Sequence, residues 1–308
     1  MEQKIIICWG DSLTEGMGMA VGAGTKYPDA LQNMLGDEYK VWNGGYSGDK
    51  SVAIMSRQGA YTLTVKEDIC FDRGEFTVKL GLRKNGFGFL LDDGTELNCM
   101  NVQVGSSSPN PTIPRINPVV IDGEPYSLGL TFDGVEEKTD GAYYVTLTRA
   151  SAEFGLRIPA GASVTLGNTD LSASSYCELF LIGANDALST SEADISLLIS
   201  RYQRMVDHLT HDHYLAIIPY WSEGALIEPF KKAFGDHAVS VMELITPERM
   251  QAVGITPNED DLARLEKYSM PASLRYLNRP GDVHLNEHGY KLIAQFAYER
   301  GQALGYWK

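Results

Sequence analysis

The pattern of apolar and polar residues predicts an α/β arrangement at the start of the chain. Residues 4–9 are mostly apolar and β-branched, as in a buried parallel strand. After a Gly-rich turn, Tyr27–Leu35 has helical spacing, and Lys40–Trp42 predicts a second short strand. A further helix is expected to begin at Ser51 and to run to about Gln58. This succession of strand, helix and strand is typical of α/β proteins.

The pattern changes from about Tyr61 to Ser174, where short runs alternate polar and apolar residues without a good helix pattern. Examples are Phe76–Leu80, Phe87–Leu91 and Tyr143–Leu147. Turn signals separate the runs at Asp93-Gly94, Asp122-Gly123, Asp133-Gly134 and Asp140-Gly141, and Gly105–Pro111 is expected to be an exposed loop. We therefore predict an inserted all-β sandwich or barrel at residues 61–175.

The α/β pattern returns at Tyr176, where Glu178–Ile182 predicts a buried strand. Further strands are expected at Tyr214–Tyr220 and Ala238–Leu244, and helices at Glu192–Leu209, Ala225–Phe234 and Asn286–Leu304. Residues 1–60 and 176–308 are thus predicted to form one discontinuous α/β domain with a doubly wound parallel sheet.

Composition narrows the classes of partner. The chain has 308 residues, 44% of them hydrophobic, which is enough for a full core. Its net charge of -14 argues against binding nucleic acid or an anionic membrane surface, because both require concentrated Lys and Arg. No apolar stretch approaches the length of a membrane-spanning helix. The sequence leaves open whether the protein forms a homo-oligomer.

The chain has four cysteines, Cys8, Cys70, Cys99 and Cys177. Their spacing contains no CxxC pair and no zinc pattern, which favours free thiols in a reducing compartment. The even number of cysteines leaves one or two disulfides possible. Cys8 is expected in the core because its neighbours are apolar. The first apolar run is too short for a signal peptide, so we expect a cytoplasmic protein, or a secreted one if a signal has been removed. His208, His211 and His213 have no matching acids or cysteines and are interpreted as a solvated helix end, not a metal site.

Three polar or Gly-rich segments follow predicted strands: Gly10-Asp11-Ser12, Asn43–Asp49 and Gly183–Asp186. The active crevice of an open α/β sheet lies at the carboxyl ends of its strands. A fourth segment, Gly281–His284, precedes the last helix and contains a histidine. A nucleophilic serine needs a base within hydrogen-bond reach and donors aimed at the oxyanion, and these segments offer both.

The four segments resemble those of the GDSL/SGNH hydrolase family. The matches are Gly10-Asp11-Ser12-Leu13-Thr14-Glu15-Gly16, Asn43-Gly44-Gly45-Tyr46-Ser47-Gly48-Asp49, Gly183-Ala184-Asn185-Asp186, and His284 with Asn286 and Gly289. The resemblance implies a three-layer, flavodoxin-like fold. It also implies that Ser12 is the nucleophile, that Gly48, Asn185 and the Ser12 amide are oxyanion donors, and that His284 is the base. Alternatively, Gly48 only provides a turn with positive φ, and Asn185 only caps a strand end.

One departure from the family pattern concerns the acid. The family has Asp-x-x-His, whereas Gly281 stands at that position here and Asp282 lies two residues before His284. Residues two apart point to the same face of an extended backbone, so Asp282 is our candidate for the acid. The alternative is a Ser–His dyad in which a backbone carbonyl orients the imidazole. Asp11 is expected to bond local amides and not to act as the acid.

The resemblance therefore implies a carboxylic-ester hydrolase that works through an acyl-enzyme at Ser12, without a cofactor or metal. By analogy with relatives that carry β modules, we expect short-chain or O-acetyl esters, carbohydrate esters among them. Two alternatives remain open. One is a carbohydrate-binding protein on an impaired esterase scaffold, and the other is an acyltransferase.

Overall fold

Contacts along the chain divide it into two units. The computed structural model describes residues 3–17, 26–82, 86–97, 116–132, 143–150, 155–167, 169–278 and 282–308. The first unit comprises residues 1–51 and 174–308, and the second comprises residues 52–173. The insertion was expected at residues 61–175, whereas the second unit begins at residue 52. The difference is the helix α3 (Ser51–Gln58), whose Ala53 packs in the core of the second unit.

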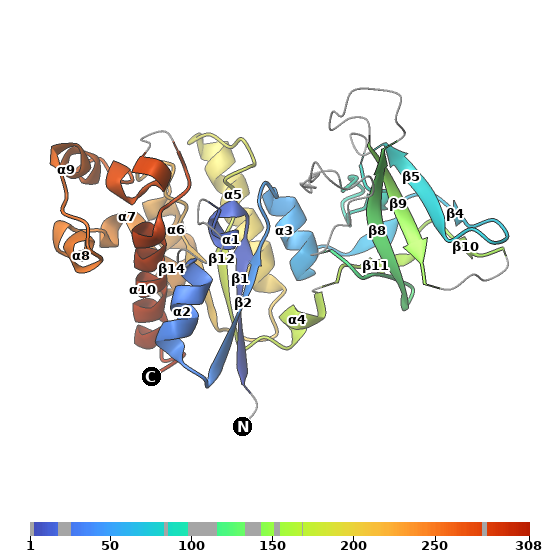
Figure 1. Cartoon of the computed structure of the whole chain (residues 1–308), viewed down its shortest axis with the longest axis horizontal. Coiled ribbons are helices and arrows are strands. Elements are labelled where there is room, and N and C mark those ends of the chain that lie inside the picture. The colour runs from blue at the N-terminus through green and yellow to red at the C-terminus, as the bar shows by residue number, and fades with distance from the viewer. Residues whose placement is uncertain are drawn as a thin grey trace. The chain divides into compact units, whose positions relative to one another are not determined.

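The first unit is built on a five-stranded parallel sheet. Its strands are β1 (Lys4–Gly10), β2 (Tyr39–Gly45), β12 (Cys177–Leu181), β13 (Tyr214–Ile217) and β14 (Ala238–Val239). They lie in the order β14-β13-β12-β1-β2, so β12 is the central strand, and β1 pairs with β2 on one side and with β12 on the other (Figure 1). The register places Gly10 beside both Gly45 and Leu181. The segments that follow these three strands therefore start from one edge of the sheet.

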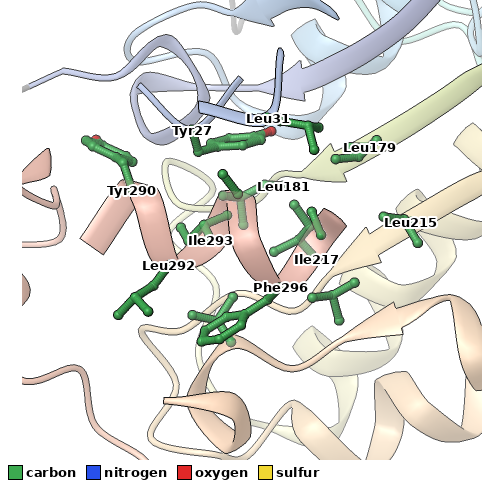
Figure 2. Close-up of a cluster of buried hydrophobic side chains, with 14 of the residues drawn as sticks. Tyr27, Leu31, Leu179, Leu181, Leu215, Ile217, Tyr290, Leu292, Ile293 and Phe296 are labelled. Atoms are coloured by element: carbon green, nitrogen blue, oxygen red, sulfur yellow. The ribbon is translucent and has the colours of Figure 1, made fainter. Parts of the chain in front are cut away.

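Alternate residues of the central strands face opposite sides of the sheet. Ile6 and Cys8 of β1 belong to a large apolar core together with Leu179 and Leu181 of β12. Two helices, α2 (Tyr27–Leu35) and α10 (Glu287–Ala303), pack side by side over this face (Figure 1). Figure 2 shows residues of α10 directed toward the strands, with Ile293 close to Leu181.

The opposite face carries Trp9 and Glu178, both fully buried. The Trp9 indole N–H donates to the Glu178 carboxylate at 2.9 Å. Helices α5 (Glu192–Asp207) and α6 (Ile227–Phe234) pack against each other through Tyr202 and Phe230, whose ring centroids are 4.9 Å apart. The Tyr202 hydroxyl in turn bonds the Ile182 amide, just beyond β12.

The chain between β14 and α10 differs most from the prediction. The strand expected at Ala238–Leu244 ends at Val239, and α7 (Val241–Leu244) follows. A mostly apolar segment such as Val-Met-Glu-Leu fits either a strand or one helical turn. In the structure it forms helix α7, on which Val241 and Met242 are buried. The unpredicted elements that follow are α8 (Pro247–Ala252), α9 (Glu259–Leu265), η4 (Ala272–Leu274) and η5 (Tyr276–Asn278). A further unpredicted turn, η3 (Gly235–His237), lies just before β14. The strand expected at Tyr214–Tyr220 ends at Ile217.

The second unit contains antiparallel β structure, as the alternating pattern predicted. Seven strands lie in the order β5-β9-β8-β7-β11-β3-β6, and β10 pairs separately with β4. Their bounds are β3 (Leu63–Val65), β4 (Ile69–Cys70), β5 (Thr77–Leu82), β6 (Phe89–Leu90), β7 (Val119–Ile121), β8 (Glu124–Phe132), β9 (Tyr143–Arg149), β10 (Arg157–Ile158) and β11 (Ser163–Thr165). A short helix, α4 (Thr169–Ala173), lies where no helix was predicted.

Two of the predicted turns join strands of this unit. Asp122 and Gly123 both have positive φ, 48° and 88°, in the two-residue connection between β7 and β8. Gly94 has a φ of 81° in the turn that connects Leu90 with its antiparallel bridge partner Glu96. The predicted turns at Asp133-Gly134 and Asp140-Gly141, and the predicted loop Gly105–Pro111, lie outside the described residues.

Cys8 is fully buried in the core, as predicted. Cys8, Cys70 and Cys177 are free thiols, and Cys99 lies outside the described residues. Among the helices that the structure describes, none combines the length and the apolar character needed to cross a membrane.

Candidate active site

Ser12 lies at a sharp turn between strand β1 and a one-turn helix. β1 ends at Gly10, and α1 (Ser12–Glu15) begins two residues later. A side chain at Gly10 would overlap Thr14 Oγ1 and would lie 2.7 Å from the Leu181 carbonyl oxygen, so only glycine fits there. Ser12 is 6% exposed. The local sequence thus forces the chain to turn directly at the carboxyl edge of the sheet.

Asp11 fixes this turn, as the sequence suggested. Its Oδ1 accepts the Leu13 amide at 3.0 Å and caps helix α1. Burial raises the pKa of Asp11 to about 7, a shift that the Leu13 hydrogen bond opposes and that the negative charges of Asp49 and Asp186 reinforce. Asp11 is therefore a structural carboxyl that does not contact His284.

The structure brings Ser12, His284 and Asp282 into one hydrogen-bonded chain. His284 Nε2 lies 2.9 Å from Ser12 Oγ, and His284 Nδ1 lies 2.8 Å from Asp282 Oδ1. The imidazole and the carboxyl are each about one-fifth exposed. Nδ1 faces a carboxylate and Nε2 faces the hydroxyl, so a neutral imidazole protonated at Nδ1 leaves Nε2 free to accept the serine proton.

The short spacing between acid and base is accommodated by the backbone. Asp282 Oδ1 accepts the His284 amide at 2.9 Å as well as the ring N–H. A carboxyl that bonds the amide two residues ahead forms an Asx-type turn. With this geometry, Asp282 reaches the imidazole although it stands only two residues before His284. Gly281 lies outside the described residues.

The second segment is fastened to helix α1. Glu15 Oε2 accepts the Ser47 amide at 2.7 Å and also the Ser47 hydroxyl. At the end of β2, a side chain on Gly45 would overlap the Glu15 amide nitrogen, so the two segments meet without room for a Cβ atom. Gly48 has a φ of 80°, which favours glycine. These contacts fix the position of the Gly48 loop relative to the turn that carries Ser12.

The third segment joins this loop through hydrogen bonds in both directions. Asn185 Nδ2 donates to the Asp49 carbonyl at 3.0 Å, and the Ser51 amide donates to Asp186 Oδ1 at 3.0 Å. Asp186 also pairs with Arg201 of α5 at 2.9 Å. Among the described residues, neither Gly48 nor Asn185 hydrogen-bonds Ser12 itself. One amide proton of Asn185 therefore remains for another acceptor, because Nδ2 carries two.

Two of the three histidines considered as metal ligands interact with groups of their own unit. His211 Nε2 lies 2.9 Å from Ser175 Oγ, and His213 Nδ1 lies 3.1 Å from the Tyr176 carbonyl. Burial lowers the pKa of His211, and the neighbouring His213 lowers it further. Within the described ranges, no three His, Cys, Asp or Glu side chains are grouped closely enough to hold a metal ion.

Several residues that support the site were not singled out by sequence. Glu15 and Asp186 lie inside the motif segments, so their positions offered a signal. Arg201, Tyr220 and Arg275 lie far along the chain in segments without a motif, and only the fold brings them to these loops. Comparison with protein-family models, curated proteins and solved structures yields no match to this chain.

Proposed function

We propose that the protein is a serine hydrolase that cleaves carboxylic esters through an acyl-enzyme at Ser12. The observation that carries the proposal is the continuous chain from Asp282 through His284 to Ser12, with contacts of 2.8 Å and 2.9 Å. A serine, an imidazole and a carboxylate in this order are the groups needed to generate a serine nucleophile at neutral pH.

In the proposed reaction, Ser12 Oγ attacks the ester carbonyl while His284 Nε2 takes the hydroxyl proton. Asp282 stabilises the imidazolium that forms. The tetrahedral intermediate collapses as His284 returns the proton to the leaving alcohol, and the acyl group stays on Ser12. Water then attacks the acyl-enzyme with His284 again as base, which releases the acid and restores the serine.

The oxyanion of each tetrahedral intermediate needs donors, and the amides of Ser12 and Gly48 and the side chain of Asn185 are our candidates. Support comes from the bonds that bring the Gly48 and Asn185 loops together at the edge where Ser12 lies. Removing one such donor from a serine hydrolase costs about 10²–10³ in kcat.

The assignment of the first unit to a flavodoxin-like, doubly wound fold is part of the same proposal. Counted within the first unit alone, the strand order becomes 2-1-3-4-5, the order of flavodoxin-like doubly wound sheets. In such sheets the ligand crevice lies outside the carboxyl ends of the strands, where the order reverses. β1 and β12 flank that point here. We therefore propose an SGNH-like hydrolase unit interrupted by a β unit, acting on short-chain or O-acetyl esters, including those of carbohydrates.

Labelling with a fluorophosphonate probe tests the nucleophile. We expect the wild-type chain to be labelled and Ser12→Ala to lose labelling. Ser175→Ala is a matched control, because Ser175 also lies 2.9 Å from a histidine ring nitrogen and bonds a carboxylate, Glu178, at 3.1 Å. Equal labelling of the wild type and Ser12→Ala would contradict the proposal.

Substrate class is tested separately with a panel of esters from acetyl to long acyl chains, acetylated sugars included. Activity confined to short acyl groups would support a small acyl site. Product analysis with a sugar acceptor present distinguishes hydrolysis from acyl transfer, since transfer yields a new ester and hydrolysis yields the free acid.

A further inference from the structure

The segment that carries both the acid and the base is held by its backbone carbonyls. Arg275 Nη1 donates to the carbonyl oxygen of Asp282, and the Tyr220 hydroxyl donates to the carbonyl oxygen of Val283 at 3.0 Å. The next carbonyl, that of His284, accepts the backbone amide of Tyr276 at 2.9 Å. Each of the three consecutive carbonyls therefore has its own donor.

Both side-chain donors are buried and anchored. Tyr220 follows strand β13 and is 3% exposed. Arg275 lies between the turns η4 and η5, is 9% exposed, and also donates from Nε to the Met270 carbonyl at 3.2 Å. Arg275 forms an antiparallel bridge with Leu285, so its backbone runs beside the segment that its side chain holds.

Side-chain packing within the segment is slight, because Val283, between Asp282 and His284, is 36% exposed, whereas Leu285 directly after the segment is fully buried. The Asp282 carboxylate reaches both the His284 amide and Nδ1 within the Asx-type turn of residues 282–284. If either peptide unit rotated, its carbonyl would lose its donor and the carboxylate would turn away from the imidazole.

We propose that Tyr220 and Arg275 are positioning residues for the acid–base pair, which hold the turn of residues 282–284 in place so that an acid two residues before the base can serve it. Neither side chain needs to touch the substrate. The inference rests on the proposed function, which gives Asp282 and His284 the roles of acid and base. The geometry of the contact between these two side chains can be measured without any enzymatic activity.

The first experiment compares Tyr220→Phe with wild type and with Tyr39→Phe. Tyr39 is a matched control because its buried hydroxyl also donates to a backbone carbonyl, that of Tyr306 at 3.3 Å. With a p-nitrophenyl acetate substrate, we expect Tyr220→Phe to lower kcat about tenfold at unchanged KM, because small displacements of a catalytic pair are costly. Tyr39→Phe should stay within twofold of wild type.

The split between kcat and KM and the effect of a conservative variant add readouts that a purely structural role would not move. A looser Asp282–His284 contact should lower kcat in Tyr220→Phe and leave KM unchanged. Arg275→Met should behave in the same way, and Arg275→Lys should recover part of kcat because it retains a donor.

Nuclear magnetic resonance of the His284 Nδ1 proton tests the geometry directly. We expect a downfield resonance in wild type and Tyr39→Phe that is broadened or lost in Tyr220→Phe. Unchanged kcat and an unchanged resonance in Tyr220→Phe would overturn the inference. If the wild type fails to react with a fluorophosphonate, the proposed function fails, and the resonance still decides whether Tyr220 positions the pair.

Discussion

Replacing Asp282 by asparagine tests the least usual part of the site. The carboxylate accepts two hydrogen bonds from His284 through Oδ1, one from Nδ1 at 2.8 Å and one from the backbone amide at 2.9 Å. Asparagine keeps one oxygen, which can still accept the backbone amide. Its amide nitrogen can instead donate to Nδ1, which moves the ring proton to Nε2. An imidazole in that form donates to Ser12 and cannot remove its proton.

The expected loss is large in rate and small in stability. A wrong tautomer and the lost charge on the acid together reduce kcat by about 10³–10⁴, or roughly 4–5 kcal/mol of transition-state stabilisation. The Asp282 and His284 side chains are about one-fifth exposed. An amide nitrogen placed toward Nδ1 can no longer accept the His284 backbone amide, so the turn loses one part-exposed hydrogen bond, and the free energy of unfolding should fall by only about 1 kcal/mol.

The assay is steady-state ester hydrolysis from pH 5 to pH 9, paired with urea unfolding of the same samples. Asp122→Asn is the control, since Asp122 Oδ1 also accepts a backbone amide, that of Ser163 at 2.9 Å, in the second unit. An Asp282→Asn enzyme that retained more than a tenth of the wild-type kcat would remove Asp282 from the triad and leave a Ser12–His284 dyad.

Three further predictions concern the turn and the oxyanion side. Asn185→Ala should lower kcat by about 10²–10³ with little change in KM, as steady-state kinetics would show; a kcat equal to wild type would exclude Asn185 as an oxyanion donor. Asp11 has its pKa raised to about 7, so the folded state binds more protons than the unfolded state between about pH 4 and pH 7, and wild-type stability falls as pH rises through this range. In urea unfolding at a series of pH values, Asp11→Asn should remove this pH dependence, which amounts to up to about 4 kcal/mol in the free energy of unfolding across the range. An unchanged slope would refute the interpretation of Asp11 as a buried acid. Gly45→Ala should destabilise the first unit by several kcal/mol, because its Cβ atom would overlap the Glu15 backbone; an unfolding midpoint equal to wild type would show that the two segments can separate without cost.

The parts of the site that sequence could predict are those encoded locally. Each motif segment directly follows a predicted strand or precedes the last helix, and parallel strands bring their carboxyl ends to one edge. The observed register of β1 with β2 and β12 does this for the segments at Ser12, Asn43–Asp49 and Gly183–Asp186. Position along a strand was therefore sufficient to group these residues.

The rest depended on tertiary contacts without a local signature. Tyr220 and Arg275 are an ordinary aromatic residue and an ordinary cation in the sequence, and only packing directs them to the carbonyls of residues 282 and 283. Helix α7 was misread as strand because a mostly apolar segment of four residues, Val-Met-Glu-Leu, fits both periods. The contacts group most of helix α3 with the second unit, which its amphipathic pattern did not indicate, because the pattern does not say which core its apolar face joins.

The position of β1 between β2 and β12 also has a consequence for the order in which the protein is made. β1 and β2 leave the ribosome early, but β12, the other neighbour of β1, follows only after residues 52–173 have been synthesised. Since domains generally fold as units during translation, the β unit has its full sequence before β1 has both of its partner strands. Until then β1 presents an open, hydrophobic edge, which is a template for aggregation. Nascent or truncated chains that end before Tyr176 should therefore be the species that depend most on chaperones.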